Sequence, residues 1–392
     1  MDSTTHARNA WRMDVSSLRR ARVDQVGSFL RPEALKAAFL RHARGQLDAA
    51  ALRAAQDAAI RPLLARQAAL GLPFATDGEY RRLNWQVSFS EVEGWDLWPG
   101  TWRSFLASPD NVYAGERPGA KGEDAVLSFQ TPATGRLRLA RSFPLEELRF
   151  VTAESSLPAK ITLMGPDRVA QMCDIAGSAP HYADREAFLA DVIAIQREMA
   201  AGLAAAGCAY LQLDEPSFTG YVDPATLERM RARGEDPLAN LQRAIAADNA
   251  VIAGLEGVVT GLHICRGNRA SMWHREGHYD GIAEAVFGGL RFDRLLLEYD
   301  SERAGGFAPL RFVPKGVMVV LGLITTKSAE AETVDALLRR IEEAARHIAP
   351  EQLALSPQCG FASGIGGNAL PESAQWRKIE MMLETARRAF GG

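Results

Sequence analysis

The chain has 392 residues, of which 47% are apolar and 24% are charged, a mixture typical of a soluble globular enzyme. Its formal net charge of −3 gives no basic surface on which nucleic acid would bind. The longest apolar stretches, such as residues 316–324, are well short of the roughly 20 residues that cross a bilayer, so we expect no membrane partner.

The cysteines are few and widely spaced. Four of them occur in the whole chain, which argues against a disulfide framework and favours a reducing compartment. The first twenty residues contain arginines but no apolar core, so a secretory signal is not apparent. We therefore expect a cytoplasmic protein.

From residue 22 onward, short apolar or β-branched runs alternate with Ala- and Leu-rich helical stretches. The runs predict eight strands, at 22–28, 74–78, 160–165, 209–216, 258–265, 294–300, 316–324 and 353–357. The clearest helices are predicted at 47–70, 184–206, 237–254, 330–348 and 374–389. Eight strand–helix units favour a closed (β/α)₈ TIM barrel over an open doubly wound sheet. No GxGxxG or GxxxxGK motif points to a common nucleotide-binding fold.

Two segments do not fit a minimal barrel. Residues 1–21 are polar, and we expect a flexible N-terminal arm before a single catalytic barrel over 22–392. Residues 95–150 follow the second strand, and their second half alternates like a hairpin. We interpret 95–150 as an insertion that forms a lid or subdomain over the mouth of the barrel.

The fifth strand ends in "HIC", which places a histidine and a cysteine on one face. His263 and Cys265 are two residues apart, and side chains at this spacing in a strand project together. In a TIM barrel, catalytic groups come from the C-terminal ends of several strands, where Glu298 and Cys359 are also expected. Two readings remain open: a tetrahedral zinc site with an exchangeable carboxylate, or buried cysteines that act as small hydrophobic residues.

A set of motifs resembles the catalytic half of cobalamin-independent methionine synthases. They are "VGSFLRP" (26–32), "TDGEYRR" (76–82), "LMGP" (163–166), "LQLDEP" (211–216), "HICRGN" (263–268), "LEYDSERAG" (297–305) and "SPQCGF" (356–361). The chain looks closer still to the short single-barrel relatives of that half and of the epoxyalkane–coenzyme M transferases. The resemblance covers nearly the whole chain. It implies zinc (Zn²⁺) bound by His263, Cys265, Glu298 and Cys359.

The same resemblance implies a thiol methyltransferase that makes methionine from homocysteine. Glu298 would act in catalysis by yielding its place on zinc to the substrate sulfur, which zinc keeps as a thiolate. The resemblance further implies that Gly27, Ser28, Glu79 and Asp214 bind the amino and carboxylate groups of the thiol. For the two acids, helix capping or pairing with arginine is the structural alternative.

The motifs depart from the family on the side of the methyl donor. No tryptophan follows "LMGP", Gly220 replaces a folate-contacting Glu, and Ile324 or Thr325 stands in place of a catalytic histidine after strand seven. These departures disfavour polyglutamyl folate as the donor. His274 and His278, in the loop after strand five, are candidates for the missing general acid.

Other parts of the donor side stay open at this stage. Arg266 and Arg303 are candidates for binding an anion, with structural salt bridges as the alternative. The tryptophans at 85, 95, 98 and 102 could stack on a planar donor or fill a small core under the insertion. The sequence identifies neither the donor, for which a corrinoid carrier protein is one candidate, nor the oligomeric state, for which a homo-oligomer is one candidate.

Three functions compete. The leading one is zinc-dependent S-methylation of homocysteine. The second keeps zinc and the thiolate but uses another electrophile, such as an epoxide opened by coenzyme M. The third is a non-catalytic zinc- or thiol-binding protein. Two acids beside the thiol would repel a sulfonate, which favours an amino-acid thiol.

Overall fold

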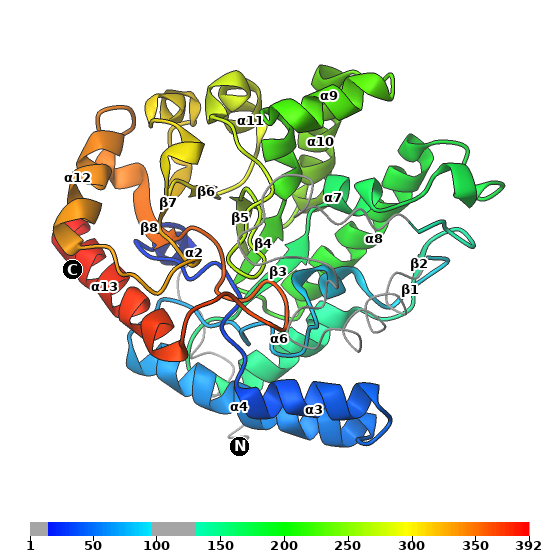
Figure 1. The fold of residues 1–392 in the computed structure, drawn as a ribbon, viewed down its shortest axis with the longest axis horizontal. Coiled ribbons are helices and arrows are strands. Elements are labelled where there is room, and N and C mark those ends of the chain that lie inside the picture. The colour runs from blue at the N-terminus through cyan, green and yellow to red at the C-terminus, as the bar shows by residue number, and fades with distance from the viewer. Residues whose placement is uncertain (1–14, 96–130, 392) are drawn as a thin grey trace, which may run out of the picture.

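The structure is a computed structural model that describes residues 15–95 and 131–391. A sheet of six parallel strands occupies its centre (Figure 1), in the order β3-β4-β5-β6-β7-β8. The bounds of these strands are β3 Lys160–Met164, β4 Tyr210–Asp214, β5 Val259–Ile264, β6 Arg294–Glu298, β7 Met318–Ile324 and β8 Leu353–Pro357. Almost every residue in them is buried, because parallel strands in such folds are covered on both faces and therefore read as continuous apolar runs.

Two extended segments close the barrel where the first two strands were predicted. Val23 pairs with Leu355 of β8, and Ala75 pairs with Ala159 just before β3, each as a single parallel bridge. Between the two segments, the Gln25 side-chain amide donates to the carbonyl oxygen of Phe74 at 2.9 Å. The (β/α)₈ barrel is confirmed, and its first two strands are reduced to one-residue bridges.

Helices surround the sheet (Figure 1). The helices are α2 Val15–Arg19, α3 Glu33–Ala43, α4 Ala49–Ala69, α6 Phe143–Glu154, α7 Pro166–Gln171, α8 Arg185–Ala205, α9 Pro224–Ala232, α10 Pro237–Ile252, α11 Ala283–Gly289, α12 Val334–Ala344 and α13 Glu372–Phe390. The five predicted helices correspond to α4, α8, α10, α12 and α13, with shifts of a few residues at their ends. None of the helices in the described ranges is both long and apolar enough to span a membrane.

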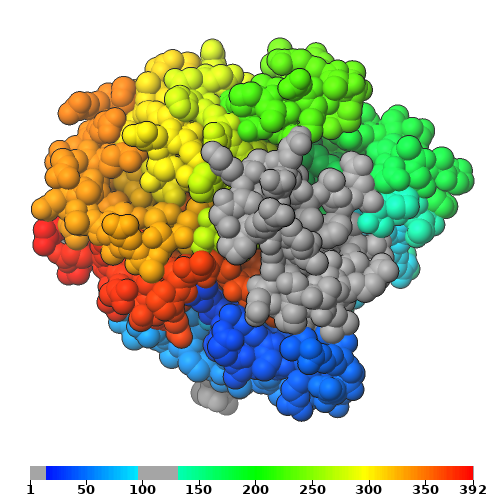
Figure 2. Space-filling view, viewed as in Figure 1, coloured from blue at the N-terminus to red at the C-terminus, as the bar shows by residue number. Residues whose placement is uncertain are grey.

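The two ends of the barrel domain lie against each other. Figure 2 shows the segment before α13, in orange-red, beside the blue N-terminal segment. The rings of Phe29 and Trp376 stack with their centroids 5.3 Å apart, and the backbone N–H of Leu30 donates to the Gln375 side chain at 2.7 Å. These contacts hold the first extended segment beside the loop that follows β8.

Part of the expected flexible arm over 1–21 is ordered. Residues 1–14 lie outside the described residues, but α2 and the residues up to Ala21 pack against the barrel. Leu18 is 1% exposed and contacts Phe74, Tyr210 and Val259. Arg294 donates to the backbone carbonyls of Arg19 and Ala21. One apolar side chain in a polar stretch, together with a buried arginine that needs acceptors, explains why this segment is held.

The predicted insertion over 95–150 is only partly described, since residues 96–130 lie outside the described ranges. The alternation near its end does not form a local hairpin among the described residues: β2 (Arg138–Leu139) pairs antiparallel with β1 (Val92–Glu93) before the insertion. The helix α6, also within that range, packs on β3 and α8 as part of the barrel wall. A lid remains a prediction for the rest.

Candidate active site

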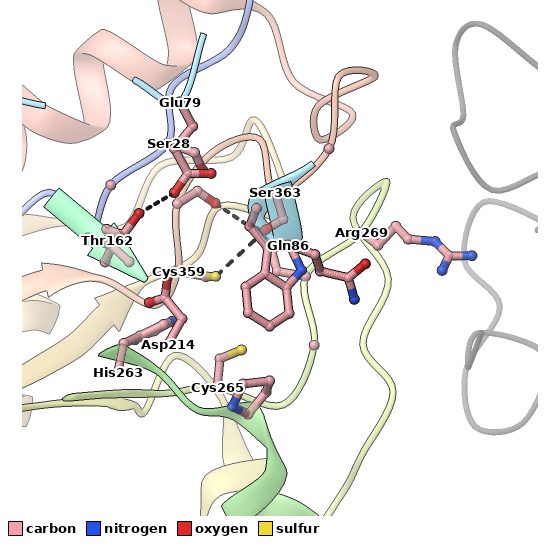
Figure 3. A pocket seen from close by; sticks show the side chains of 18 of the residues that line it. Ser28, Glu79, Gln86, Thr162, Asp214, His263, Cys265, Arg269, Cys359 and Ser363 are labelled. Atoms are coloured by element: carbon pink, nitrogen blue, oxygen red, sulfur yellow. Dashed lines mark hydrogen bonds between the residues drawn. The ribbon is translucent and has the colours of Figure 1, made fainter. Parts of the chain in front are cut away.

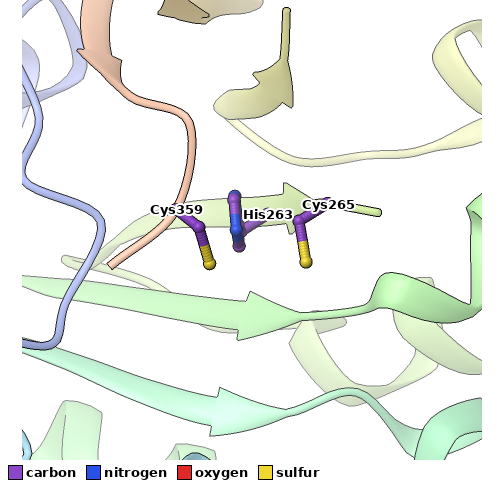
Figure 4. A group of neighbouring side chains, drawn as sticks. All are labelled: His263, Cys265 and Cys359. Carbon is purple, nitrogen blue, oxygen red and sulfur yellow. The ribbon is translucent and has the colours of Figure 1, made fainter. Parts of the chain in front are cut away.

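Three of the predicted ligands converge at the C-terminal mouth of the barrel. His263 is the last residue but one of β5, Cys265 follows that strand directly, and Cys359 lies in the loop after β8 (Figure 4). One donor atom from each, a ring nitrogen and two sulfurs, lies within 4.8 Å of the others. All three residues are buried, at 3% to 7% exposure. The structure therefore brings together residues that are 96 positions apart (263 to 359) in the chain.

The chemistry of this trio suits a metal cation. Both ring nitrogens of His263 are buried without a hydrogen-bond partner among the described residues, which is costly unless something binds them. The contact with Cys359 holds the pKa of Cys265 well below its usual range, whereas the same contact raises the pKa of Cys359. A cation between the two sulfurs would favour the thiolate form of both. An imidazole and two thiolates are ligands that zinc prefers.

The fourth predicted ligand, Glu298, is not part of this group. Its carboxylate accepts a hydrogen bond from the backbone N–H of Arg266 at 2.6 Å and one from the Arg303 guanidinium at 3.3 Å. The chain turns after β5 so that the Arg266 N–H points at this carboxylate, and coordination of a metal by Glu298 stays a prediction. The catalytic role expected for Glu298 depends on its release from that contact.

Gly27 and Ser28 line the same cavity from the first extended segment. The Ser28 hydroxyl accepts from the backbone N–H of Ala362 at 3.2 Å, which ties it to the loop that carries Cys359. Gly360 permits this approach: a Cβ there would lie 2.0 Å from the Ser28 oxygen. Val26, immediately before, has a φ of 65°, a strained value for a β-branched residue. The strained turn places Gly27 and Ser28 beside the sulfur atoms.

Glu79 reaches the cavity from the second extended segment. Its Oε1 atom accepts from the Thr162 hydroxyl at 2.9 Å and lies 3.4 Å from the Arg82 guanidinium. Its Oε2 atom is buried without a partner among the described residues. Thr162, which the sequence analysis missed, holds this acid in place (Figure 3). The free oxygen is available to a cationic ligand group.

Asp214 ends β4 directly beside His263 of β5. The amide of Gln212 donates to its Oδ1 atom at 2.7 Å. Burial raises the pKa of Asp214 to about 7, and the attraction of His263 only partly offsets that effect. An ammonium group bound here would stabilise the carboxylate. Gln212 was also missed, although its i−2 spacing from Asp214 predicts the same face of the strand.

These groups line one cavity, which Figure 3 shows with the two sulfurs facing it. Its volume is about 1090 Å³, including the part open to solvent. Trp85, one of the tryptophans considered for donor stacking, lines this cavity. Trp95 instead belongs to the hydrophobic core, with its ring against Phe188. The tryptophans at 98 and 102 lie outside the described residues.

The two candidate general acids differ in position. His274 lines the cavity, and burial together with the surrounding cations lowers its pKa to about 3, so its imidazole is neutral near pH 7. His278 is exposed, packs beside Gly305 and is not among the cavity residues. The structure thus does not place His278 where a general acid is needed.

The two arginines considered for anion binding are engaged elsewhere. Arg266 is fully buried and donates to the carbonyl oxygens of Glu298 and Gly277. Arg303 pairs with Glu298 and Asp300. Both therefore fasten the loops around the site, which is the structural alternative.

The fold and this centre define a class of protein: a (β/α)₈ barrel whose C-terminal mouth carries a His–Cys–Cys group next to two acids. In this fold, catalytic residues occupy that mouth. The group is assembled from the end of β5 and the loop after β8, two strands that are not neighbours in the sheet, as expected for an active site rather than a local structural metal motif.

Comparison with known proteins identifies the family. Residues 163–386 match the cobalamin-independent synthase catalytic domain. The chain is 35% identical over 93% of both chains to an uncharacterized protein of Bacillus subtilis, YxjG, and 25% identical over 65% of this chain and 64% of the other to a methionine synthase of Pyrococcus abyssi. A structure of a putative vitamin B12-independent methionine synthase from Listeria monocytogenes matches with a TM-score of 0.71 at 27% identity, covering 94% of this chain and 98% of that chain.

The chain belongs to the cobalamin-independent methionine synthase family. This membership confirms the resemblance inferred from the motifs and indicates a methyltransferase that acts on a thiol. It implies a thiol substrate and a methyl donor.

Proposed function

We propose that the protein is a zinc-dependent methyltransferase that converts homocysteine to methionine. The observation that carries this proposal is the group of three donor atoms from His263, Cys265 and Cys359 within 4.8 Å of one another at the cavity wall. Zinc held there would lower the pKa of the substrate thiol and keep its sulfur nucleophilic. The protein's own residues would supply position and charge.

The residues around the trio suit the other end of homocysteine. The free oxygen of Glu79 and the carboxylate of Asp214 provide two acceptors for its ammonium group. The backbone and hydroxyl of Gly27 and Ser28 suit its carboxylate. With the amino-acid end fixed, the thiol would be directed toward the two cysteine sulfurs, which turns a bimolecular reaction into an oriented one.

The fourth ligand position is assigned to the incoming thiol. Glu298 would occupy it in the absence of substrate only by leaving the Arg266 N–H. That hydrogen bond offers the carboxylate a second resting place, which suits a ligand that must be exchangeable. The role of Glu298 as fourth ligand therefore stays a proposal.

The donor is proposed to be other than polyglutamyl folate, because the chain lacks the family's tryptophan, Glu and histidine on that side. A methyl group delivered on a corrinoid carrier protein is one such source, and a homo-oligomer is one candidate assembly. Of the two candidate histidines, His274 is the one assigned to contact the donor, because it lines the cavity.

X-ray absorption at the zinc edge tests the proposal directly. We expect two sulfur ligands in the protein alone and three after homocysteine is added, because the substrate thiol enters beside Cys265 and Cys359. Coenzyme M serves as the control thiol: its sulfonate should be repelled by Glu79 and Asp214, so the spectrum should change little. Absence of zinc overturns the proposal. A third sulfur from coenzyme M alone would favour the epoxide-type reaction.

A substitution at Asp214 tests the binding of the amino group. We expect Asp214→Asn to weaken homocysteine binding by about tenfold or more, since a charge-assisted hydrogen bond contributes about 1.5–3 kcal/mol. Zinc content should be unchanged, because the Asp214 carboxylate is not among the three donor atoms. Calorimetric titration with homocysteine and metal analysis measure the two effects. An unaltered homocysteine affinity would remove Asp214 from the site.

A further inference from the structure

The charged groups that line the cavity fall into two sets. Glu79 and Asp214 are acidic, whereas Arg168, Arg269 and Arg275 are basic. They occupy different parts of the cavity: Glu79 acts on Asp214, while the charges that act most on Arg275 are those of Asp223 and Cys265. In Figure 3, Arg269 extends away from the sulfurs. Homocysteine would provide a partner for the acidic set but not for Arg275.

Arg275 is a cation that lines the same cavity as the cysteine sulfurs. Its guanidinium donates to the backbone carbonyl of Pro216 and lies over Gly220, where a Cβ would be 3.3 Å from Cζ. No carboxylate among the described residues forms an ion pair with it. The nearest acid, Asp223, is already engaged: its Oδ1 accepts the N–H of Glu276, and its Oδ2 accepts from Thr226. Burial lowers the pKa of Arg275, which reflects the cost of enclosing this charge without a full partner.

His274 is the second polar group here. Its Nδ1 atom is enclosed and has no hydrogen-bond partner within the described ranges. The ring packs over Gly267, the second residue after Cys265, since a Cβ on that glycine would lie 2.2 Å from the imidazole. Arg168, a residue of α7, also lines the cavity. An anion between these groups would satisfy the imidazole and offset the enclosed positive charge.

We infer that Arg168, His274 and Arg275 form a subsite for the anionic group of the second substrate, a phosphate-, sulfonate- or carboxylate-bearing electrophile. This inference rests on the proposed function, because it assigns the donor side of the same cavity. Its chemical reason is direct: a thiolate repels an anionic electrophile, and the arginines cancel that repulsion. Gly220 contributes to the subsite, since an acidic side chain at this position would pair with Arg275 and neutralise its charge.

Titration of the full-length protein with inorganic phosphate tests the subsite. We expect phosphate to bind, and Arg275→Gln to weaken the binding by about tenfold or more, as for the loss of a hydrogen bond between charged groups. Arg275→Lys should restore part of the affinity because it keeps the charge. Arg311→Gln is the matched control: Arg311 is exposed and also donates to a carbonyl, that of Ala308, at 2.8 Å. It should bind phosphate like the unaltered protein.

A second titration separates the sources of the anion. Phosphate affinity should be unchanged by saturating homocysteine, because the anion belongs to a different molecule. Competition would instead mean that the arginines hold the carboxylate of the thiol, which overturns the inference. Equal phosphate binding by the Arg275→Gln variant, or none by the unaltered protein, overturns it as well.

The zinc-free Cys359→Ser protein keeps the two proposals apart. Phosphate should still bind to this variant, since Cys359 does not contribute to the subsite. Phosphate binding with no zinc in the unaltered protein would refute the proposed function and leave the anion subsite standing.

Discussion

Replacing Cys359 with serine is expected to remove most of the zinc and leave the barrel folded. Cys359 supplies one of three donor atoms that lie within 4.8 Å of one another, and a serine hydroxyl does not ionise to give a comparable ligand. Loss of a residue that only supports a ligand typically costs 10–100-fold in metal affinity, so loss of a ligand itself should cost at least about a hundredfold. Elemental analysis of purified protein should fall from about one zinc per chain to a small fraction of that.

The matched control is Cys173→Ser. Cys173 is also buried, but its sulfur lies 3.4 Å from the Ser178 hydroxyl and is not among the three donor atoms at the barrel mouth. Its zinc content should equal that of the unaltered protein. The Cys359 variant should unfold at a temperature similar to that of the parent, because Cys359 lies on a loop outside the main hydrophobic cluster. Zinc retained at about one per chain in the Cys359 variant would refute the ligand assignment.

The trio could be predicted because barrel geometry, not local sequence, brings it together. The C-terminal ends of parallel strands meet at one edge, so strand-end residues such as His263 and Cys359 become neighbours whatever their separation in the chain. The backbone of Glu298 also lies at this edge, because β6 ends at this residue. Its carboxylate accepts a hydrogen bond from a backbone N–H, so its coordination of a metal stays a prediction. Side-chain partners of this kind leave no periodic signal in a sequence.

The donor side was harder to predict for a related reason. Arg275 and His274 lie in the irregular loop after β5, where no periodicity indicates which side chains face inward. His278, four residues beyond His274, turns out to solvent. The first two strands were found by their apolar residues, but single bridges at Val23 and Ala75 were not foreseen. There, side-chain hydrogen bonds replace the ladder that a sequence pattern predicts.

Lys160→Met is expected to destabilise the protein by about 3 kcal/mol, near the lower end of the cost of breaking a buried ion pair. The Lys160 ammonium lies 2.5 Å from Oδ1 of Asp24, and both side chains are 0% exposed. Tyr210 donates to the other oxygen of Asp24 at 3.1 Å, which leaves partial compensation. Urea unfolding with and without the substitution measures the difference in free energy.

Two variants serve as controls. Lys36→Met removes the same ammonium from the pair with Glu33, whose side chain is 86% exposed, and should change stability by less than about 1 kcal/mol. Adding Asp24→Asn to Lys160→Met should not restore stability, because the buried Arg294 guanidinium, 3.7 Å from Oδ2 of Asp24, then loses its carboxylate partner. Equal stability of Lys160→Met and the parent protein would show that the pair does not hold the barrel closed.

The effect should extend to the active site, because Asp24 belongs to the segment that carries Gly27 and Ser28. Oδ1 of Asp24 also accepts the backbone N–H of Val26 at 2.9 Å, which fixes the strained turn before Gly27. In Lys160→Met the turn should relax, and homocysteine binding should weaken while zinc content stays constant. A stable, zinc-loaded variant with unchanged homocysteine affinity would separate closure of the barrel from substrate binding. The buried pair of Lys160 and Asp24 thus supports the proposed thiol site through the backbone that runs from Asp24 to Gly27.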